Sequence, residues 1–150
     1  MKKVLVAVDG SDKSLEAADY AMSIVNKERA QLIILNVLDT EPWFYGQSAY
    51  GWATEDEQRK VYAHEIMERE KILVKIKEKA ENINIQPKTE VLMYPQTIST
   101  AAAIVNYAEK EKVDLIIIGT RGRTGITRML LGSVASAVVA HAHCTVMVVK

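Results

Sequence analysis

The sequence has few of the residues that mark several common classes of protein. It has one cysteine, Cys144, so an internal disulfide is ruled out and we expect a reducing compartment, the cytoplasm. Its 19 basic and 19 acidic residues cancel, which argues against a nucleic-acid partner held by bulk charge. No apolar run approaches the ~20 residues that cross a bilayer, so we expect no membrane partner. The opening MKKVLVAVDGS reaches Asp9 too soon for a secretion signal and is more typical of a first strand.

Short apolar runs rich in valine and isoleucine recur along the 150 residues, of which 49% are hydrophobic. They lie at 4–8, 32–38, 89–93, 114–119 and 145–149. Continuous runs of this kind predict strands buried on both faces. Helical patterns separate them, so the order strand–helix repeats along the chain. This order predicts one α/β domain over residues 1–150, a doubly wound, Rossmann-like fold with a five-stranded parallel sheet and helices on both faces.

The predicted helices rest on apolar stripes with helical spacing. Their members are Leu15, Ala18, Met22 and Val25; then Ile66, Leu73, Ile76 and Ala80; then Ala101, Ile104, Val105 and Ala108; and finally Val134, Val138 and His141. Ser11 or Asp12 would cap the first helix, and Thr97 or Ser99 the third. The second stripe lies in a long charged segment of about 55–83, whose charges predict a solvated face with ion pairs.

The segment 40–57 interrupts this alternation, because it is long for a connection in a compact domain. It carries both tryptophans and the single phenylalanine of the chain. One interpretation is a loop that packs its aromatic side chains over a hydrophobic edge. A lid over a ligand and a surface for a partner are the alternatives.

Four of the seven glycines lie in or beside one basic loop, at positions 119, 122, 125 and 132. In a doubly wound sheet, ligands bind beyond the carboxyl ends of the strands where the strand order reverses. Asp9 and Gly119 each follow or end a predicted strand and would meet there. Backbone N–H groups at the start of a helix near Ser133 would favour an anion, and arginines at 121, 123 and 128 add positive charge. These features together predict a phosphate-binding loop.

The common phosphate motifs do not explain this loop. The chain has no G-x-x-x-x-G-K-[ST] and no G-x-G-x-x-G pattern. Its own pattern is Gly119-x-x-Gly122, nine residues, then Gly132-Ser133, directly after a buried strand. With VLVAVDGSDKS at the start and VDLIIIGTRGRTG and LLGSVASAVVAHAHCTVMVV near the end, the chain resembles the universal stress protein family along nearly its whole length.

The resemblance implies an adenine nucleotide as ligand, ATP with ADP or AMP as alternatives, and Mg²⁺ with the phosphates. Carried over by position, it implies that Ala7, Val8 and Asp9 lie under the adenosine, with Asp9 bonded to base or ribose, while Val37 and Ile118 flank the base. Gly119 would lie against the ribose, with Arg121 and Gly122 near the phosphates. Gly132, Ser133, Val134 and Ala135 would hold the phosphates. Ala135 replaces a common hydroxyl residue, so its hydrogen bond would move to Ser136 or be lost.

Each of these residues has a simpler explanation too. Asp9 alone is more often a turn or capping residue, and arginines are usually solvated. His141, His143 and Cys144 suggest zinc, but no second ligand cluster accompanies them, so we predict no metal site and expect the histidines to pack near a helix end.

Two functions remain open at this point: a nucleotide-dependent regulatory module of the stress response, and a slow ATP-hydrolysing enzyme. A non-catalytic interaction module is a further alternative. No catalytic set is evident, so we predict no catalytic residues and at most slow turnover. A phospho-acceptor receiver domain fails, because Gly10 and Met93-Tyr94 stand where its acidic residues would be. The uncharged final strand, 144–149, predicts a homodimer formed by pairing of this edge with its own copy, as the resemblance also implies.

Overall fold

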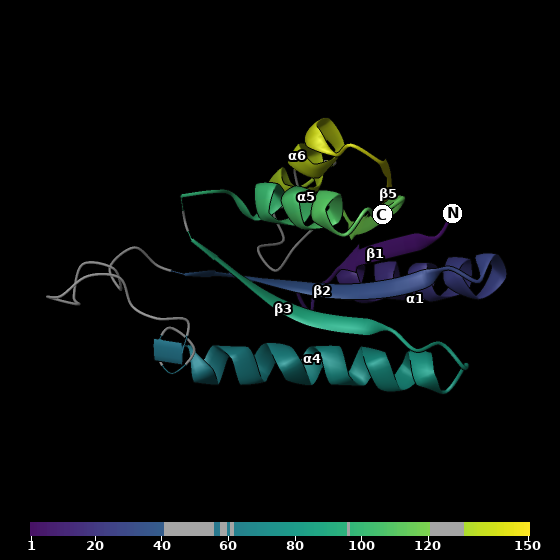
Figure 1. Ribbon diagram of the computed structural model, residues 1–150, viewed down its shortest axis with the longest axis horizontal. Helices are drawn as coiled ribbons and strands as arrows, with labels where there is room; N and C mark the ends of the chain where they lie inside the picture. The colour runs from purple at the N-terminus through teal and green to yellow at the C-terminus, as the bar shows by residue number, and fades with distance from the viewer. Residues whose placement is uncertain (41–55, 58–59, 61, 96, 121–130) are drawn as a thin grey trace, which may run out of the picture.

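Figure 1 shows the computed structural model of the chain, which describes residues 1–40, 56–57, 60, 62–95, 97–120 and 131–150. Strands and helices alternate along these residues. In chain order they are β1 (Lys3–Ala7), α1 (Asp12–Glu28), β2 (Gln31–Thr40), α4 (Ala63–Glu81), β3 (Lys88–Pro95), α5 (Thr100–Lys110), β4 (Leu115–Gly119), α6 (Ser133–His141) and β5 (Thr145–Val149). The predicted alternation is therefore confirmed.

The described strands form a five-stranded sheet in the order β3-β2-β1-β4-β5. All its neighbours are parallel, with Val6 opposite Ile34 on one side of β1 and opposite Ile117 on the other. The chain moves outward from β1 to β3, returns to β4, and then moves outward to β5. The strand order thus reverses between β1 and β4, which is the position at which doubly wound sheets bind ligands.

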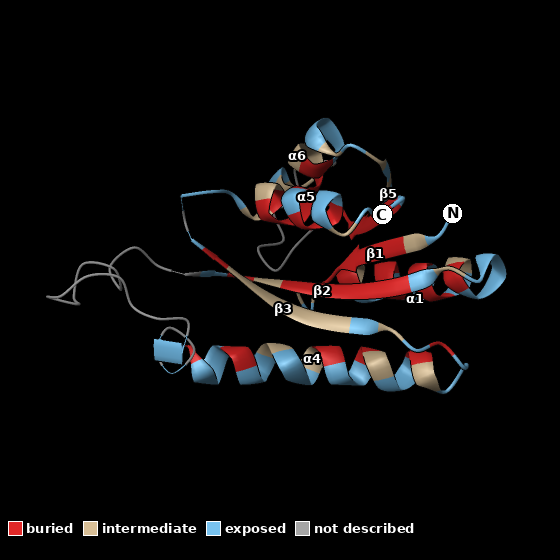
Figure 2. Ribbon diagram, in the orientation of Figure 1, coloured by how far each residue is buried: buried red, intermediate tan, exposed pale blue. Residues whose placement is uncertain are grey.

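Each face of the sheet packs against a different pair of helices (Figure 1). On one face, Val4, Val6 and Ile34 join buried residues of α1 and α4 in one core. On the other face, Leu5 and Ile116 join buried residues of α5 and α6. The central strands are covered on both sides, and Figure 2 shows them as the most continuously buried part of the chain.

Helices α1 and α5 are capped by residues that the sequence offers as caps. The Ser11 side chain accepts a hydrogen bond from the Ser14 N–H at 3.3 Å and caps α1. The Ser99 side chain accepts from the Ala102 N–H at 3.1 Å and caps α5. Side-chain oxygens of this kind satisfy N–H groups that have no partner within the helix. Both caps lie at the carboxyl-terminal end of the sheet, so they fix where α1 and α5 begin beside the predicted site.

Several burial predictions were wrong. The outer strands β3 and β5 are largely half-buried or exposed, because each has a neighbour strand on one side within the described sheet. Leu15 is 39% exposed, because the α1 face on the sheet is centred on small residues such as Ala17 and Ala21, and Leu15 lies beside that face. The second helix, α4, spans Ala63–Glu81, and residues 56–57 and 60 of the same charged segment are helical as well. The predicted apolar stripes of α4 and α5 are buried, as expected.

The segment 40–57 cannot be compared with its prediction, since all but Thr40 and residues 56–57 lie outside the described residues. The last stripe is mixed: Val138 is fully buried, Val134 is half-buried, and His141 is exposed. The expectation that the histidines pack near the helix end was wrong, because His143 is exposed too. Helix α6 buries Ala135 and Val138, and its last three residues are exposed.

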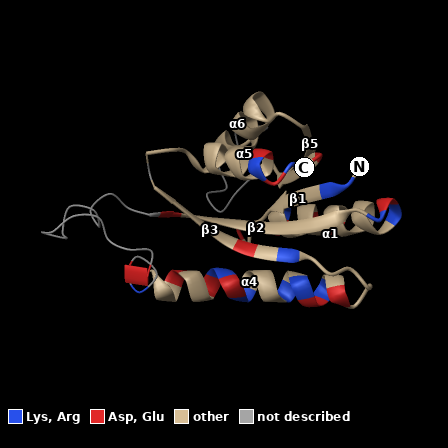
Figure 3. Ribbon diagram, viewed as in Figure 1, with Lys and Arg blue, Asp and Glu red and all other residues tan. Residues whose placement is uncertain are grey.

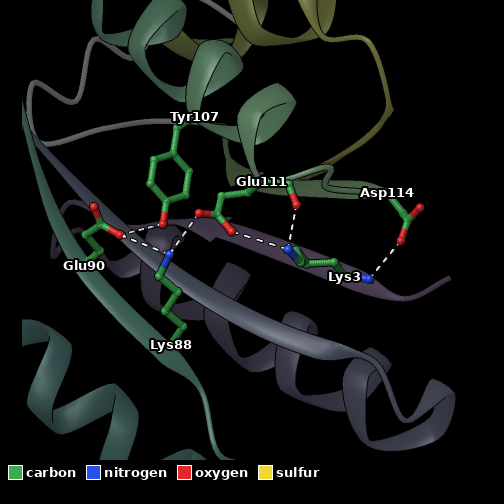
Figure 4. A network of polar contacts seen from close by, with 6 residues as sticks. All are labelled: Lys3, Lys88, Glu90, Tyr107, Glu111 and Asp114. Atoms are coloured by element: carbon green, nitrogen blue, oxygen red, sulfur yellow. Dashed lines mark hydrogen bonds and ion pairs between the residues drawn. The ribbon is translucent and has the colours of Figure 1, made fainter.

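The amino-terminal end of the sheet carries a connected set of ion pairs and hydrogen bonds, drawn in Figure 4. We call it the amino-end network; its members are Lys3, Lys88, Glu90, Tyr107, Glu111 and Asp114. Lys88 Nζ lies 3.0 Å from Glu111 Oε1 and 3.4 Å from Glu90 Oε2. Tyr107 donates to Glu90 at 2.6 Å. This network joins β1, β3 and the end of α5.

Candidate functional site

A pocket lies beyond the carboxyl ends of the strands that flank the reversal in strand order. Its cavity volume is about 160 Å³. The described residues that line it are Ala7, Val8, Asp9, Ser14, Val37, Thr100, Ile104, Ile118, Gly119, Thr120, Gly132, Ser133, Val134 and Ala135. They come from the ends of β1, β2 and β4, from the residues just after β1 and β4, and from the beginnings of α1, α5 and α6. The alternation of strands and helices therefore collects residues far apart in sequence at one place.

The lining has an apolar part and a polar part. Val37, Ile104 and Ile118 supply aliphatic side chains around the ends of the strands. Thr120 and Ser133 bring hydroxyl groups, and α6 brings its N-terminus. A flat apolar ring fits the first part and an anion the second. A volume of about 160 Å³ is below the ~300–1,000 Å³ of pockets that enclose whole drug-sized ligands, so the cavity would enclose a part of such a ligand.

Asp9 lies at the mouth of this pocket in a tight turn. Its Oδ1 accepts a hydrogen bond from the Ser11 N–H at 2.9 Å. Its own N–H donates to Ser14 Oγ at 3.3 Å, and Ser14 Oγ donates to the Ser11 carbonyl at 2.8 Å. Gly10 follows with φ +84°, a left-handed conformation that favours glycine. Asp9 is thus both a turn residue and a pocket residue, so the two interpretations of it are compatible.

Gly119 ends β4 at a point where the backbone of α1 passes very close. A Cβ atom added there would lie 2.8 Å from the carbonyl carbon of Lys13 and 2.9 Å from its oxygen. Backbone atoms cannot move aside as the tip of a side chain can. The packing of β4 against the first turn of α1 is therefore sufficient to explain this glycine, and contact with a ligand is not needed to explain it.

The start of α6 forms another wall of the pocket. Gly132 is its N-cap, with φ −66° and ψ 159°, and no side chain caps the helix. The Gly132 N–H donates to the Thr120 carbonyl at 2.7 Å, and the Thr120 N–H donates to the Val149 carbonyl at 2.8 Å. These bonds hold the start of α6 against the ends of β4 and β5. The N–H groups of the first turn lie at Ser133, Val134 and Ala135, where the helix dipole is positive.

The predicted site residues come together, apart from two. Ala7, Val8, Asp9, Val37, Ile118, Gly119, Gly132, Ser133, Val134 and Ala135 all line the pocket. Arg121 and Gly122 lie outside the described residues, as do Arg123 and Arg128. Ala135 is buried, with 2% of its surface exposed, and packs into the core of the α5 and α6 face.

The sequence reasoning missed several lining residues. Ser14, Thr100, Ile104 and Thr120 also line the pocket. Thr100 follows the cap of α5, and its hydroxyl lies 2.6 Å from the hydroxyl of Tyr94, whose pKa is raised by burial. The signal for Ser14 and Thr100 was their place beside capped helix starts, since those starts share the end of the sheet at which the site lies.

A second missed feature is a polar network directly behind the pocket. Asn36 interrupts the apolar run LIILNVL and is fully buried. Its amide Nδ2 donates to the Val8 carbonyl at 2.8 Å. Arg69 of α4 donates through one nitrogen to Asn36 Oδ1 at 2.9 Å and to the Val37 carbonyl at 3.2 Å. The sequence signal for this network was the single asparagine within an apolar run that predicts a buried strand.

The remaining chemical candidates are weaker. Among the described residues, no group of three or more His, Cys, Asp or Glu side chains is placed to hold a metal ion. Burial raises the pKa of the half-buried Cys144 thiol, which lowers its reactivity. No helix in the described part of the chain is long and apolar enough to cross a membrane.

Comparison with known proteins gives one consistent result. A model of the Universal stress protein family matches residues 1–150. A universal stress protein of Methanocaldococcus jannaschii is 42% identical over 150 residues, which cover 99% of this chain and 82% of the relative. The structure of UspA from Lactobacillus plantarum is similar with a TM-score of 0.79 at 27% identity, covering 99% of this chain and 97% of that one. A universal stress protein in complex with cAMP is similar with a TM-score of 0.66 at 25% identity, covering 99% and 96%.

Proposed function

The chain belongs to the universal stress protein family, and we propose that it is a regulatory module that binds an adenine nucleotide in the pocket between β1 and β4. The observation that carries the proposal is the convergence of the predicted site residues on that pocket. Its aliphatic part suits a base and the start of α6 suits phosphate. A relative of the same fold is a complex with cAMP, which supports the adenine class of ligand.

We propose ATP as the ligand, with ADP and AMP as the alternatives that one experiment separates. The phosphates would extend from Gly132 and Ser133, with Mg²⁺ beside them. The protein is purified without added nucleotide, and the ligand that co-purifies is identified by native mass spectrometry. Binding of ATP, ADP and AMP to the emptied protein is then compared by calorimetry.

A valine at position 132 tests the site itself. Gly132→Val places a branched side chain at the start of α6, where it would keep a phosphate from the backbone N–H groups. We expect at least about a hundredfold loss of affinity, equivalent to ~2.7 kcal/mol. Thr145→Ser, on the exposed side of β5, is the control. Equal binding by wild type and Gly132→Val would contradict the site.

We infer regulation rather than catalysis from the chemistry of the lining. Of the described lining residues, Asp9 is the one with an ionisable side chain, and its carboxylate already holds the turn at Ser11. Efficient phosphoryl transfer needs a held metal and a positioned nucleophile. Steady-state turnover of ATP should therefore stay below about 1 per second. A rate in the ordinary enzyme range would favour the ATP-hydrolysing alternative.

We also propose that the protein is a cytoplasmic homodimer formed through β5. This strand is last in the described sheet order, and TVMVV carries no charge or proline to block pairing. Figure 3 shows that α6 beside it also carries no Lys, Arg, Asp or Glu. Val146→Pro with Val148→Lys should convert a sedimenting dimer into a monomer. A wild-type monomer at micromolar concentration, or a dimer that survives both changes, would contradict this.

A further inference from the structure

The network behind the pocket lies at the point where regular pairing of β1 with β2 ends. The last pair in the register is Ala7 with Leu35, and the Val8 N–H donates to the Leu35 carbonyl at 2.9 Å. In a parallel ladder, the main-chain groups of every second residue face the same neighbour. Val37 therefore turns its carbonyl to the same side as Leu35, beyond the end of β1, where the pocket begins.

Two carbonyls at this end of the sheet are held by side chains rather than by the ladder. The Val8 carbonyl accepts the Asn36 amide at 2.8 Å, and the Val37 carbonyl accepts Arg69 at 3.2 Å. Both valines line the pocket. Asn36 has no exposed surface, and the Arg69 side chain is 18% exposed. A planar guanidinium in such a place holds its acceptors in a fixed geometry.

Arg69 and a bound base would approach the Val37 carbonyl from opposite faces of the sheet. Arg69 reaches the strand end from α4, whereas the aliphatic part of the pocket, Val37, Ile104 and Ile118, lies on the face covered by α5 and α6. A carbonyl oxygen has two lone pairs, so a donor from one face leaves the second for a donor from the other. The aliphatic part of the pocket, which includes Val37 and Ile118, is where a base would lie. The exocyclic amino group of adenine is a donor, whereas hypoxanthine presents a carbonyl at the same position.

We propose that Arg69 is a positioning residue that sets base selectivity: through its bonds to Asn36 and Val37 it orients the Val37 carbonyl to accept a base amino group. The proposal rests on the proposed function, because it requires a nucleotide in the pocket. Arg69 does not line that pocket; it lines a wide, charged hollow between the loop at Asp9 and α4. Its effect on the ligand is exerted through strand β2.

The test compares AMP with inosine monophosphate by calorimetry. Wild type should bind AMP at least about tenfold more tightly, as expected for one well-placed hydrogen bond. Arg69→Met should weaken AMP binding by about tenfold and leave inosine monophosphate nearly unchanged, so that the preference disappears. A purely structural role for Arg69 would change the melting temperature and weaken both ligands together.

Lys71→Met is the matched control, since it removes a cation two positions along the same helix. Lys71 is 61% exposed, pairs with Glu68 at 2.5 Å, and lies outside the pocket. It should keep the wild-type affinities and preference. Arg69→Lys is the second variant: its ammonium lacks the planar fork, so it should reduce the preference by a smaller factor. If Arg69→Met does not fold, Arg69→Lys decides by the same comparison.

Each outcome separates the two proposals. Failure of wild type to bind ATP, ADP and AMP alike overturns the proposed function. If wild type binds ATP or ADP but not AMP, the same comparison is made between that nucleotide and its inosine counterpart. Binding of AMP by wild type without preference over inosine monophosphate overturns only the role of Arg69. The role of Arg69 is also overturned if the folded Arg69→Met protein keeps the preference for AMP, or if it loses affinity for AMP and inosine monophosphate equally. Loss of the preference in Arg69→Met, with Lys71→Met unchanged, supports it.

Discussion

At the amino-terminal end of the sheet, charged side chains bond to one another, whereas at the carboxyl-terminal end most polar groups in the pocket are hydroxyls and main-chain groups. Lys88 contacts Glu90 and Glu111, and Lys3 donates to the Glu111 carbonyl at 2.6 Å (Figure 4). The pocket contains one ionisable lining residue among those described, Asp9. Figure 3 shows the same contrast along the chain, with charge on α4 and the strand starts and little on α6.

The two ends of one sheet thus carry different kinds of polar group. The amino-end network pairs its charged groups with one another: Lys88 with Glu90 and Glu111, and Lys3 with Glu111. The pocket keeps N–H groups and hydroxyls at the ends of the strands and helices, where a parallel sheet brings them together. Asn36, which is fully buried, and Arg69, which is half-buried, bond to each other and also to the main chain of the pocket residues Val8 and Val37.

The largest expected effect comes from a substitution that disrupts packing at the carboxyl-terminal end of the sheet. Gly119→Val should lower the free energy of unfolding by about 3 kcal/mol, because its Cβ would overlap the Lys13 backbone. Gly132→Val is the comparison within the same pocket. It should cost about 1 kcal/mol or less, since its backbone angles suit any residue and only the capping preference changes. Urea unfolding measures both, and equal costs would contradict the explanation of Gly119.

The next prediction tests whether the pocket and the amino-end network contribute independently to the free energy of unfolding. AMP at 100 times its dissociation constant should stabilise wild type by about 2.7 kcal/mol. The same increment is expected in Tyr107→Phe, because separate sites contribute additively. Thermal unfolding with and without AMP gives both increments. A smaller increment in the variant would show that the amino-end network influences the pocket.

A smaller effect measures the amino-end network alone. Tyr107→Phe removes the hydrogen bond to Glu90 and should cost about 1 kcal/mol at neutral pH. Tyr20→Phe is a suitable control, because Tyr20 is 57% exposed. Urea unfolding of the two variants should give a clear cost for position 107 and almost none for position 20.

The last prediction concerns the pH dependence of the same network. Burial and the bond to Glu90 raise the pKa of Tyr107 to about 12. Between pH ~10 and ~12 the unfolded chain therefore loses this proton before the folded chain does, so stability falls as pH rises. Tyr107→Phe should show a shallower decline than wild type between pH ~9 and ~11.5 in urea unfolding. Parallel declines would contradict the contribution of Tyr107.

The sequence by itself was enough to predict the fold class and ten of the residues that line the pocket. Apolar runs and helical stripes determine the alternation, and alternation with right-handed crossovers allows few arrangements. Asp9, Gly119 and Gly132 could be placed at one rim because the carboxyl ends of parallel strands lie together. The sequence narrowed each of the helix caps of α1 and α5 to two residues, of which Ser11 and Ser99 form the caps, because a capping side chain bonds to N–H groups nearby in the chain.

Tertiary structure alone decided the rest, because it depends on which distant groups meet. The half-burial of β3 and β5 follows from their outer places in the sheet, which apolar content does not reveal. The close packing of Gly119 against the Lys13 backbone, which is a second reason for a glycine beside the predicted ligand contact, depends on how α1 lies against β4. The bonds from Arg69 to Asn36 and Val37 join positions 33 and 32 residues apart, and no local pattern encodes such a contact. Local propensity and periodicity are properties of short segments, whereas these contacts exist only once α4 packs across the end of the sheet.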